Sequence, residues 1–279
     1  MTDAAAWRGR VGEVWAREHA RTERAFAGVA AVLDHAILRH APERGRAADI
    51  GCGVGSTTLA LAAARPGLHV TGIDLSPALL AVARERGGVG GPAFVAGDVE
   101  AVLPTLAPLD LLVSRHGVMF FADPVAGFAA LRRSVAFGAP LVFSCFRPRA
   151  DNEWATTVDA ALDIAVSARD DVYAPGPFAL SDEARLRAVL AAAGWTDVDA
   201  TAHDVAYAVG GGAAPIEDAL DFYRSIGPAA SVLAAASAGE RGRIEARLRD
   251  LFAARIHSGT ITFTAATWVV SAHAGKDLP

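Results

Sequence analysis

Three glycines occupy alternate positions directly after an apolar run that ends in an acid. The stretch ADIGCGVGS, residues 48–56, places Gly51, Gly53 and Gly55 behind Asp49. Glycine lets the backbone turn tightly and approach a ligand closely, and the helix that follows such a turn offers unpaired N–H groups to a negatively charged group. This pattern predicts a loop that binds a cofactor carrying an anionic group.

The spacing of these glycines helps to separate the cofactors that such loops hold. A dinucleotide fingerprint has glycine at its first, third and sixth positions, and here the sixth position is Ser56. A phosphate-binding P-loop needs a lysine directly after its glycines, and the only lysine of the chain is Lys276. The two leading candidates are a dinucleotide, whose third glycine is missing, and S-adenosylmethionine.

Apolar runs alternate with helical patterns around this loop, between about residues 46 and 146. Such alternation predicts a parallel sheet with helices on its faces. Expected helices include 57–64, 77–86 and 125–135, and Pro77 behind Ser76 is typical of a helix start. The expected strands are 46–50, 69–74, 93–96, 109–114, 139–146, 198–208 and 260–272.

Further segments are expected to cover one end of this sheet within a single domain of residues 1–279. An N-terminal helix over roughly 7–40 forms a cover of residues 1–45, before a cofactor-binding core of 46–148. Helices over 154–168, from 181 to about 194, over 216–237 and over 239–257 are also predicted. Segments 149–180 and 209–258 are interpreted as helical lid insertions, and 259–279 as the final strand and tail.

Composition narrows the partners and the compartment. The chain has 279 residues, 52% of them hydrophobic, and a net charge of −5, which gives no electrostatic support for binding a nucleic-acid backbone. Its two cysteines, Cys52 and Cys145, are too far apart in sequence to suggest a disulfide framework or a metal cluster. Because neither a signal peptide nor an uninterrupted apolar run of about 18 residues is present, we expect a cytoplasmic protein without membrane or metal.

Four segments follow one another along the chain, the first of which is Asp49 to Gly55. The others are VTGIDLS at 70–76, FVAGDVE at 94–100 and LDLLVSRHGVMFFADP at 109–124. Together they resemble one known family, the class I S-adenosylmethionine-dependent methyltransferases, and within it a bacterial subgroup that acts on small molecules. The resemblance implies a Rossmann-like sheet of seven strands, mostly parallel with an antiparallel last strand, and S-adenosylmethionine as the cofactor.

The resemblance also assigns roles to residues that follow the strands. Asp74, followed by Leu75, stands where the family has an acid that accepts hydrogen bonds from both ribose hydroxyls, and a carboxylate has two oxygens for that task. Asp98 would meet the adenine amino group, and Val99 would donate its backbone N–H to the ring. Asp49 would order the glycine loop or meet the cofactor's ammonium group. Two residues at the end of the fourth strand would pass the methionine part of the cofactor, namely Ser114 and Arg115.

His116 is the strongest catalytic candidate, because the carboxyl end of a strand is where α/β sites gather and imidazole can take a proton near neutral pH. A shape or hydrogen-bonding role is the alternative. His19 on the N-terminal helix is a second candidate, and Arg115 is expected to orient the cofactor or a substrate anion, or to pair with an acid. Apart from His116, the expected substrate-binding residues are Trp15, Met119, Phe120 and Trp154.

These expectations favour methyl transfer to the oxygen, nitrogen or carbon of a small metabolic or natural-product intermediate, without a metal. Three other classes stay open: a nucleic-acid or protein methyltransferase, a protein that binds the cofactor without catalysis, and a nicotinamide-dependent dehydrogenase. The dehydrogenase would need a third loop glycine and a tyrosine–lysine pair, which a chain whose only lysine is Lys276 lacks. Alanine-rich helices over 216–258 could close a pocket or pack against a second subunit in a homodimer.

Overall fold

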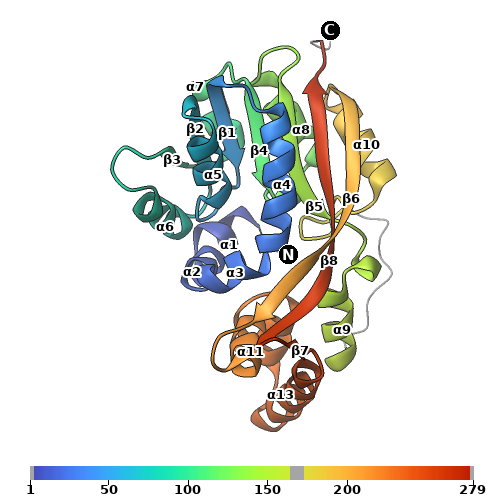
Figure 1. Ribbon diagram of the computed structural model, residues 1–279. Helices are drawn as coiled ribbons and strands as arrows, with labels where there is room; N and C mark the ends of the chain where they lie inside the picture. Colours follow the sequence, from blue (N-terminus) through green and yellow to red (C-terminus); the bar gives the residue numbers. More distant parts are fainter. Residues whose placement is uncertain (1–2, 164–172, 277–279) are drawn as a thin grey trace.

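One mixed sheet forms the centre of the protein (Figure 1). The computed structural model describes residues 3–163 and 173–276. Within these residues the strand order is β3-β2-β1-β4-β5-β8-β6, and β7 pairs with β8 alone. The strands are β1 (Arg44–Ile50), β2 (Gly67–Asp74), β3 (Ala93–Ala96), β4 (Leu111–Arg115), β5 (Pro140–Phe146), β6 (Trp195–Gly210), β7 (Ile256–His257) and β8 (Thr260–Ala274).

The strand directions confirm the expected fold class. β8 runs antiparallel to β5 and β6, and the pairs from β3 to β5 are parallel. The two-residue strand β7 adds to the seven strands expected. Asp49 lies beside Gly72 on β2 and Val113 on β4, so the three strands end at the same edge of the sheet. Ligands of open α/β sheets bind at such an edge, where the strand order reverses.

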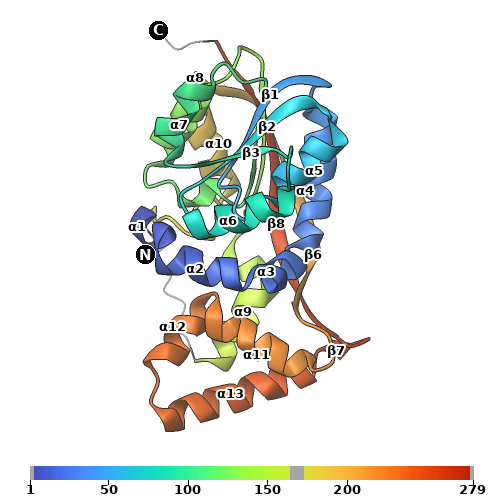
Figure 2. The same ribbon diagram turned by 90° about the vertical axis from the view of Figure 1, so that its left-hand side faces the viewer.

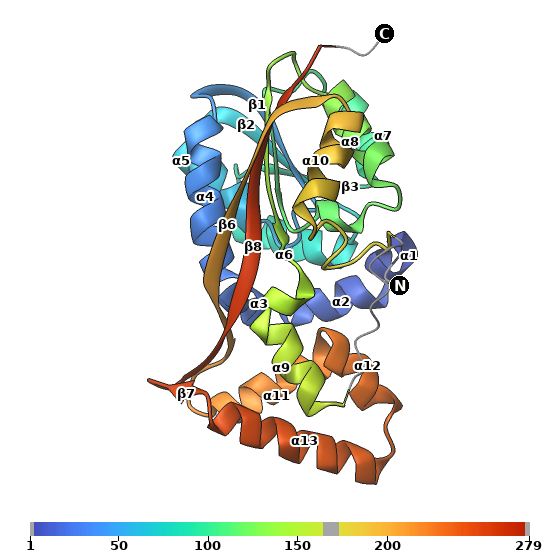
Figure 3. The same ribbon diagram turned by 90° about the vertical axis from the view of Figure 1, so that its right-hand side faces the viewer.

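Helices cover both faces of the sheet, with α4 and α5 on one face and α7, α8 and α10 on the other (Figure 3). In α6, α7, α8 and α10 the first turn is capped by the side chain of a serine or an aspartate, which accepts a backbone N–H that the helix leaves unpaired. The helices that cover or flank the sheet are α4 (Ala27–His40), α5 (Ser56–Ala64), α6 (Pro77–Gly87), α7 (Val99–Leu106), α8 (Pro124–Arg133) and α10 (Glu183–Ala192).

The remaining helices lie at the edge where the parallel strands end (Figures 1 and 2). Ion pairs connect the N-terminal helices with those that follow β6: Arg21 and Arg24 of α3 pair with Asp218 of α11 at 2.7 and 2.6 Å. The helices at this edge are α1 (Ala4–Arg8), α2 (Arg10–Arg17), α3 (His19–Ala25), α9 (Glu153–Ala161), α11 (Pro215–Ser225), α12 (Pro228–Ala235) and α13 (Ala238–Ala253), with short 3-10 turns at Val118–Phe120 and Arg149–Asp151.

Two helix predictions were wrong about continuity. The single helix expected over 7–40 is four helices, with breaks at Gly9, Glu18 and Phe26. These breaks let the chain bend around the edge of the sheet before α4 packs against it. The helix expected over 216–237 is interrupted at Gly227, whose φ is +82°, and Pro228, which has no N–H to continue the hydrogen bonding, begins α12. The expected helix over 154–168 begins as α9, and positions 164–168 lie outside the described residues.

Candidate functional site

The glycine loop has left-handed backbone at all three of its glycines. The φ angles of Gly51, Gly53 and Gly55 are +64°, +55° and +78°, a conformation that disfavours any residue with a side chain. A Cβ on Gly51 would lie 2.9 Å from the Cα of Gly117, whereas a Cβ on Gly53 would have no atom within 4 Å. The loop is therefore packed against the turn after β4 at one glycine and open at the next.

Asp74 ties this loop to the end of β2. Its two carboxylate oxygens accept hydrogen bonds from the backbone N–H of Gly53 and of Ser76, each at 2.8 Å. Burial raises the pKa of Asp74 above its ordinary value, and the backbone hydrogen bonds lower it again only in part. The carboxylate lies directly beside the open position of the loop, where the resemblance assigns it to ribose hydroxyls.

Asp49 is fully buried beneath the loop. The hydroxyl of Thr58 on α5 donates to its Oδ2 at 2.6 Å, and its Oδ1 has no hydrogen-bond partner among the described residues. Burial raises the pKa of Asp49 to about 7, against the opposing effects of Thr58 and Arg115. A buried acceptor without a partner is costly, so a ligand that donates to it would be favoured.

The turn after β4 is fixed to the end of β1 through Ser114. This buried hydroxyl donates to the carbonyl of Ile50 at 2.7 Å and accepts from the N–H of Gly117 at 3.1 Å. Between Ser114 and Gly117 in the chain, His116 has a φ of +62°, which is uncommon for a residue with a side chain. The two hydrogen bonds of Ser114 hold the two loops together, and the contact with the cofactor expected for this residue stays a prediction.

His116 projects from this turn into a cluster of aromatic rings. Its ring centroid lies 4.3 Å from that of Phe146 and 5.3 Å from that of Phe26, both nearly edge to face. Nδ1 is 2.7 Å from the hydroxyl of Ser144, and Nε2 is buried without a partner among the described residues. Burial, with a smaller effect of the Arg115 charge, lowers the pKa of His116 to about 3, so the imidazole is neutral at physiological pH.

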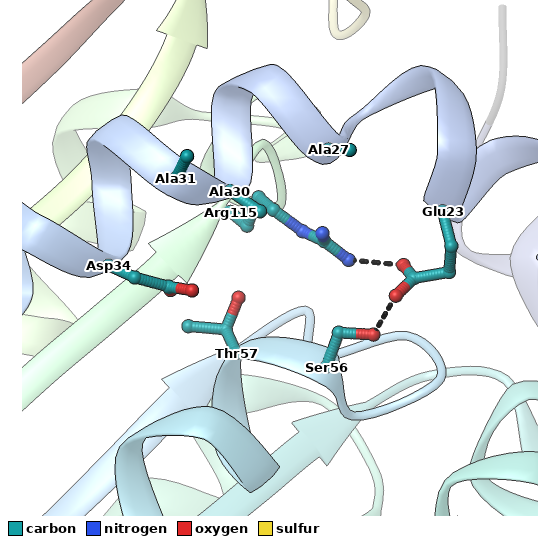
Figure 4. A pocket seen from close by; sticks show the side chains of 8 residues that line it. All are labelled: Glu23, Ala27, Ala30, Ala31, Asp34, Ser56, Thr57 and Arg115. Carbon is teal, nitrogen blue, oxygen red and sulfur yellow. Dashed lines mark hydrogen bonds and ion pairs between the residues drawn. The ribbon is translucent and has the colours of Figure 1, made fainter. Parts of the chain in front are cut away.

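Arg115 faces the opposite way and lines a cavity of about 380 Å³ between α3, α4 and the first turn of α5 (Figure 4). It donates to Glu23 at 2.6 Å, and the other oxygen of Glu23 accepts from Ser56. Burial alone would raise the pKa of Glu23, but the charge of Arg115 and these hydrogen bonds lower it. Asp34 on α4 also borders the cavity, and burial raises its pKa. The ion pair is one of the two roles that the sequence left open for Arg115.

Three predicted cofactor residues lie further along the same edge. Leu75 is half-buried after β2. Asp98 is exposed, and its side chain accepts from the N–H of Glu100 at 3.1 Å as the N-cap of α7. Val99 packs against the core with its side chain half-buried. Asp98 and Val99 thus begin a helix at the end of β3, next to the strand that carries Asp74.

The predicted substrate residues divide into two aromatic groups around Phe26. Trp15 and Phe120 both contact Trp7, at centroid distances of 5.6 and 5.2 Å, and Trp15 lies 6.5 Å from Phe26. Trp154 packs 5.1 Å from Phe146, which itself lies 6.1 Å from Phe26. Met119 is almost fully buried in the same core.

His19 lies apart from these groups, at the break between α2 and α3. Its Nδ1 is 2.9 Å from the carbonyl of Ala16, and the side chain is half-buried. This contact favours a role in shaping the N-terminal cover over contact with an acceptor. The catalytic role expected for His19 stays an untested prediction.

Sequence reasoning did not find Glu23, Phe26 or Ser144. Ser144 pairs in register with Arg115 across β4 and β5, a neighbour relation that a strand-order assignment could have supplied. Glu23 and Phe26 come from the N-terminal cover, where they are one acid among several and one apolar residue among many. No local pattern in the sequence marks them.

Fold and site together define a Rossmann-like α/β protein with a cofactor loop at the carboxyl ends of its central strands. Residues 48–143 match the family described as Methyltransferase domain. Over these residues the chain has a methyltransferase domain, which confirms the resemblance drawn from the sequence motifs and S-adenosylmethionine as the cofactor.

Relatives with assigned activities match parts of the chain. A malonyl-[acyl-carrier protein] O-methyltransferase of Anoxybacillus flavithermus is 28% identical over 60% of this chain and 67% of its own length. A trans-aconitate 2-methyltransferase of an Acidovorax species is 38% identical over 33% of this chain and 35% of its own length. Because the second alignment spans only about one third of that relative, it says little about the acceptor.

Solved structures support the fold at lower sequence identity. The YcgJ protein of Bacillus subtilis is 16% identical, with a TM-score of 0.57 over 88% of this chain and 98% of that one. A phosphoethanolamine N-methyltransferase of Haemonchus contortus, solved in complex with S-adenosyl-L-methionine, is also 16% identical, with a TM-score of 0.54 over 96% of this chain and 58% of that one. At this identity the likeness concerns the fold alone.

Neither a membrane-spanning helix nor a metal-binding group of side chains is found among the described residues. Within residues 3–163 and 173–276, no helix has the length and apolar character needed to cross a membrane. In the same ranges, no three histidine, cysteine or acidic side chains are grouped so that they could hold a metal ion.

Proposed function

We propose that the protein transfers a methyl group from S-adenosylmethionine to a small-molecule acceptor held beside the turn after β4. The observation that carries the proposal is the side chain of His116. It belongs to the turn that packs against the glycine loop at Gly117, it lies among aromatic rings, and its buried Nε2 has no partner among the described residues. An apolar, ring-lined position with one polar group is typical of a site that orients a small, largely apolar molecule.

The cofactor supplies a methyl group on a positively charged sulfur, and transfer is an in-line displacement by the acceptor's nucleophilic atom. This reaction depends mainly on holding three atoms in line and excluding water. In the proposal, Asp74 binds the ribose hydroxyls, and the unpartnered Oδ1 of Asp49 accepts from the ammonium group. The space beside Gly53 and this buried acceptor fit such a ligand. Asp98 and Val99 would meet the adenine.

The remaining predicted residues are assigned to the two ends of the bound molecules. The cavity beside Arg115 would take the carboxylate end of the cofactor, which competes with Glu23 for the guanidinium. Trp15, Phe120 and Trp154 would line the acceptor's side and exclude water. We assign His116 to hydrogen bonding with the acceptor and not to proton removal, because a group with a pKa of about 3 is a poor base at neutral pH.

An acceptor screen tests this function directly. The purified protein is incubated with S-adenosylmethionine and separate panels of phenols, carboxylic acids and amines, and S-adenosylhomocysteine is measured. Formation of S-adenosylhomocysteine that depends on an acceptor, with a matching methylated product, is the expected result. Tight cofactor binding without product from any panel or from a cellular extract would favour a binding protein without catalysis.

Replacing His116 by asparagine should slow methyl transfer without weakening cofactor binding. Asparagine tolerates the positive φ of this position but cannot reach the same acceptor atom. Loss of one hydrogen bond in the transition state corresponds to a roughly 10- to 100-fold lower kcat. Calorimetric titration with S-adenosylhomocysteine serves as the control. If the wild-type kcat instead showed an inflection near pH 6.5 that the variant lacked, His116 would be a general base.

Cofactor affinity should rise as the pH increases from about 6 to 8, because Asp49 ionises near pH 7 and only the carboxylate attracts an ammonium group. Binding at the lower pH should then release a proton, which calorimetry in two buffers of different ionisation enthalpy measures. The stability of the cofactor-free protein should change with pH in the opposite direction to the cofactor affinity. The folded state holds this proton more tightly than the unfolded chain, so stability should fall as the pH rises from about 4 to 7. Asp49→Asn should remove both dependences.

A further inference from the structure

A second cavity, of about 420 Å³, lies on the other side of α4 from the cavity beside Arg115. One wall is α4, and the floor is the face of β6 and β8 on which α4 packs; Figure 3 shows the helix beside these strands. Ala31 borders both cavities, so both adjoin α4. The residues that line this groove are Ala31, Val32, His35, Ala36, Arg39, His40, Asp199, Thr201, His203, Val269 and Ser271.

The groove gathers nitrogen-bearing side chains that can become cationic. It is lined by three of the chain's eight histidines, His35, His40 and His203. A fourth, His273 on β8, has its ring 5.7 Å from that of His40. Among the described lining residues, Arg39 is the one guanidinium. This clustering contrasts with the net charge of −5 of the whole chain.

The floor of the groove, on β6 and β8, supplies hydroxyls and a single acid. Asp199 and Ser271 are register partners on β6 and β8, and Thr201 follows Asp199 on the same face. The hydroxyl of Thr201 donates to Asp199 at 3.2 Å, which occupies part of that carboxylate. A ligand in the groove would therefore meet two imidazoles and a guanidinium on the side of α4, and hydroxyl groups with the imidazole of His203 on the side of the sheet.

We propose that this groove binds a small oxyanion with more than one negative charge, of the phosphate-ester or polycarboxylate class. Arginine presents a planar set of donors that matches carboxylate and phosphate oxygens, and protonated imidazoles add charge-assisted hydrogen bonds. A metal ion is the less suitable ligand, because the described residues contain no group of three side chains placed to coordinate one. The site is separate from the cofactor loop and does not rest on the methyl-transfer proposal.

Binding should strengthen as the pH falls. Burial lowers the pKa of His40, and the neighbouring His273 and Arg39 lower it further, while Asp199 opposes them. His35 and His203 face the same groove. A bound anion offsets the repulsion among these groups, so binding takes up protons and is favoured at pH 6 over pH 8.

Calorimetric titration with pyrophosphate and, separately, with citrate tests the proposal at pH 6 and pH 8. We expect each titrant to bind at pH 6. The affinity at pH 8 should be lower by about tenfold or more. The double variant Arg39→Gln/His40→Gln should lower the affinity at pH 6 by at least about tenfold. A matched control, Arg44→Gln/His257→Gln, removes the same residue types at exposed positions outside the groove and should change nothing. The two titrants distinguish phosphate from carboxylate chemistry.

Location is checked in the presence of saturating S-adenosylhomocysteine and in the Asp74→Ala variant, where the oxyanion should still bind. The proposal would be overturned by the absence of binding to either titrant at pH 6. It would also be overturned if the groove variant bound as tightly as the wild type, or if binding vanished with the cofactor loop filled. Failure of the acceptor screen would leave all of these readouts unaffected.

Discussion

Replacement of Asp74 by alanine is expected to lower the affinity for S-adenosylmethionine and S-adenosylhomocysteine by at least about 100-fold. Hydrogen bonds to an ionised acceptor are each worth about 1.5–3 kcal/mol, and the carboxylate is assigned two of them on the ribose. The same change removes the acceptor of the Gly53 and Ser76 N–H groups, so the loop itself loses its tie to β2. Calorimetric titration of the folded variant measures the loss.

The Asp74→Asn variant separates these two contributions. Its amide keeps one acceptor oxygen, which can still hold one of the two backbone N–H groups, while the second position becomes a donor. We expect a smaller loss of affinity, roughly 10-fold, and a thermal midpoint between those of the wild type and of Asp74→Ala, because one of the two backbone N–H groups keeps its acceptor. Wild-type affinity in a folded Asp74→Ala protein would remove the ribose assignment, and affinity for NADH alone would return the loop to the dinucleotide class.

Local patterns in the sequence were sufficient to locate the parallel strands, because each of them is an apolar run between helical patterns, whereas the antiparallel last strand was implied by the family resemblance. The strand at 93–96 was predicted at its observed bounds, and β1 and β2 differ from prediction by two residues at their first ends. The continuity of the N-terminal helix was not predictable in this way. The helices break at Glu18 and Phe26, and neither of these residues is a glycine or a proline that would mark a break in the sequence.

The site shows the same division between local and tertiary information. Asp49 and the loop glycines follow from one contiguous motif and Asp74 from the next motif along the chain, and in the structure Asp74 accepts a hydrogen bond from the loop at Gly53. By contrast, the partner of Arg115 is Glu23, 92 positions away, and the partner of His116 is Ser144 on the next strand. Such partners are set by which helix crosses which strand end. The neutral state of His116 likewise depends on burial among rings that come from separate segments.

A second large effect is expected at Gly117, which the sequence did not single out. Its φ of −78° is ordinary, so its need for glycine comes from close packing alone. A Cβ there would lie 2.4 Å from the carbonyl oxygen of Ile50 and 3.0 Å from the Cα of Gly51. Because these are backbone atoms, no rotamer change relieves the clash. Gly117→Ala should lower the free energy of unfolding by about 3 kcal/mol and the thermal midpoint by about 6–12 °C.

Gly53→Ala should lower stability less than Gly117→Ala does, and its main effect should be on cofactor affinity. Its added methyl group meets no atom, so the folded protein bears only the cost of a left-handed alanine, about 1–2 kcal/mol. Gly138 has a φ of +77° and equally open surroundings in the turn before β5, so Gly138→Ala is a matched control for that strain. Both variants should unfold at similar temperatures, but only Gly53→Ala should lose cofactor affinity, by about tenfold or more, because its methyl group occupies the approach to the loop. Equal cofactor affinity in the two variants would mean that the cofactor does not approach the loop at Gly53.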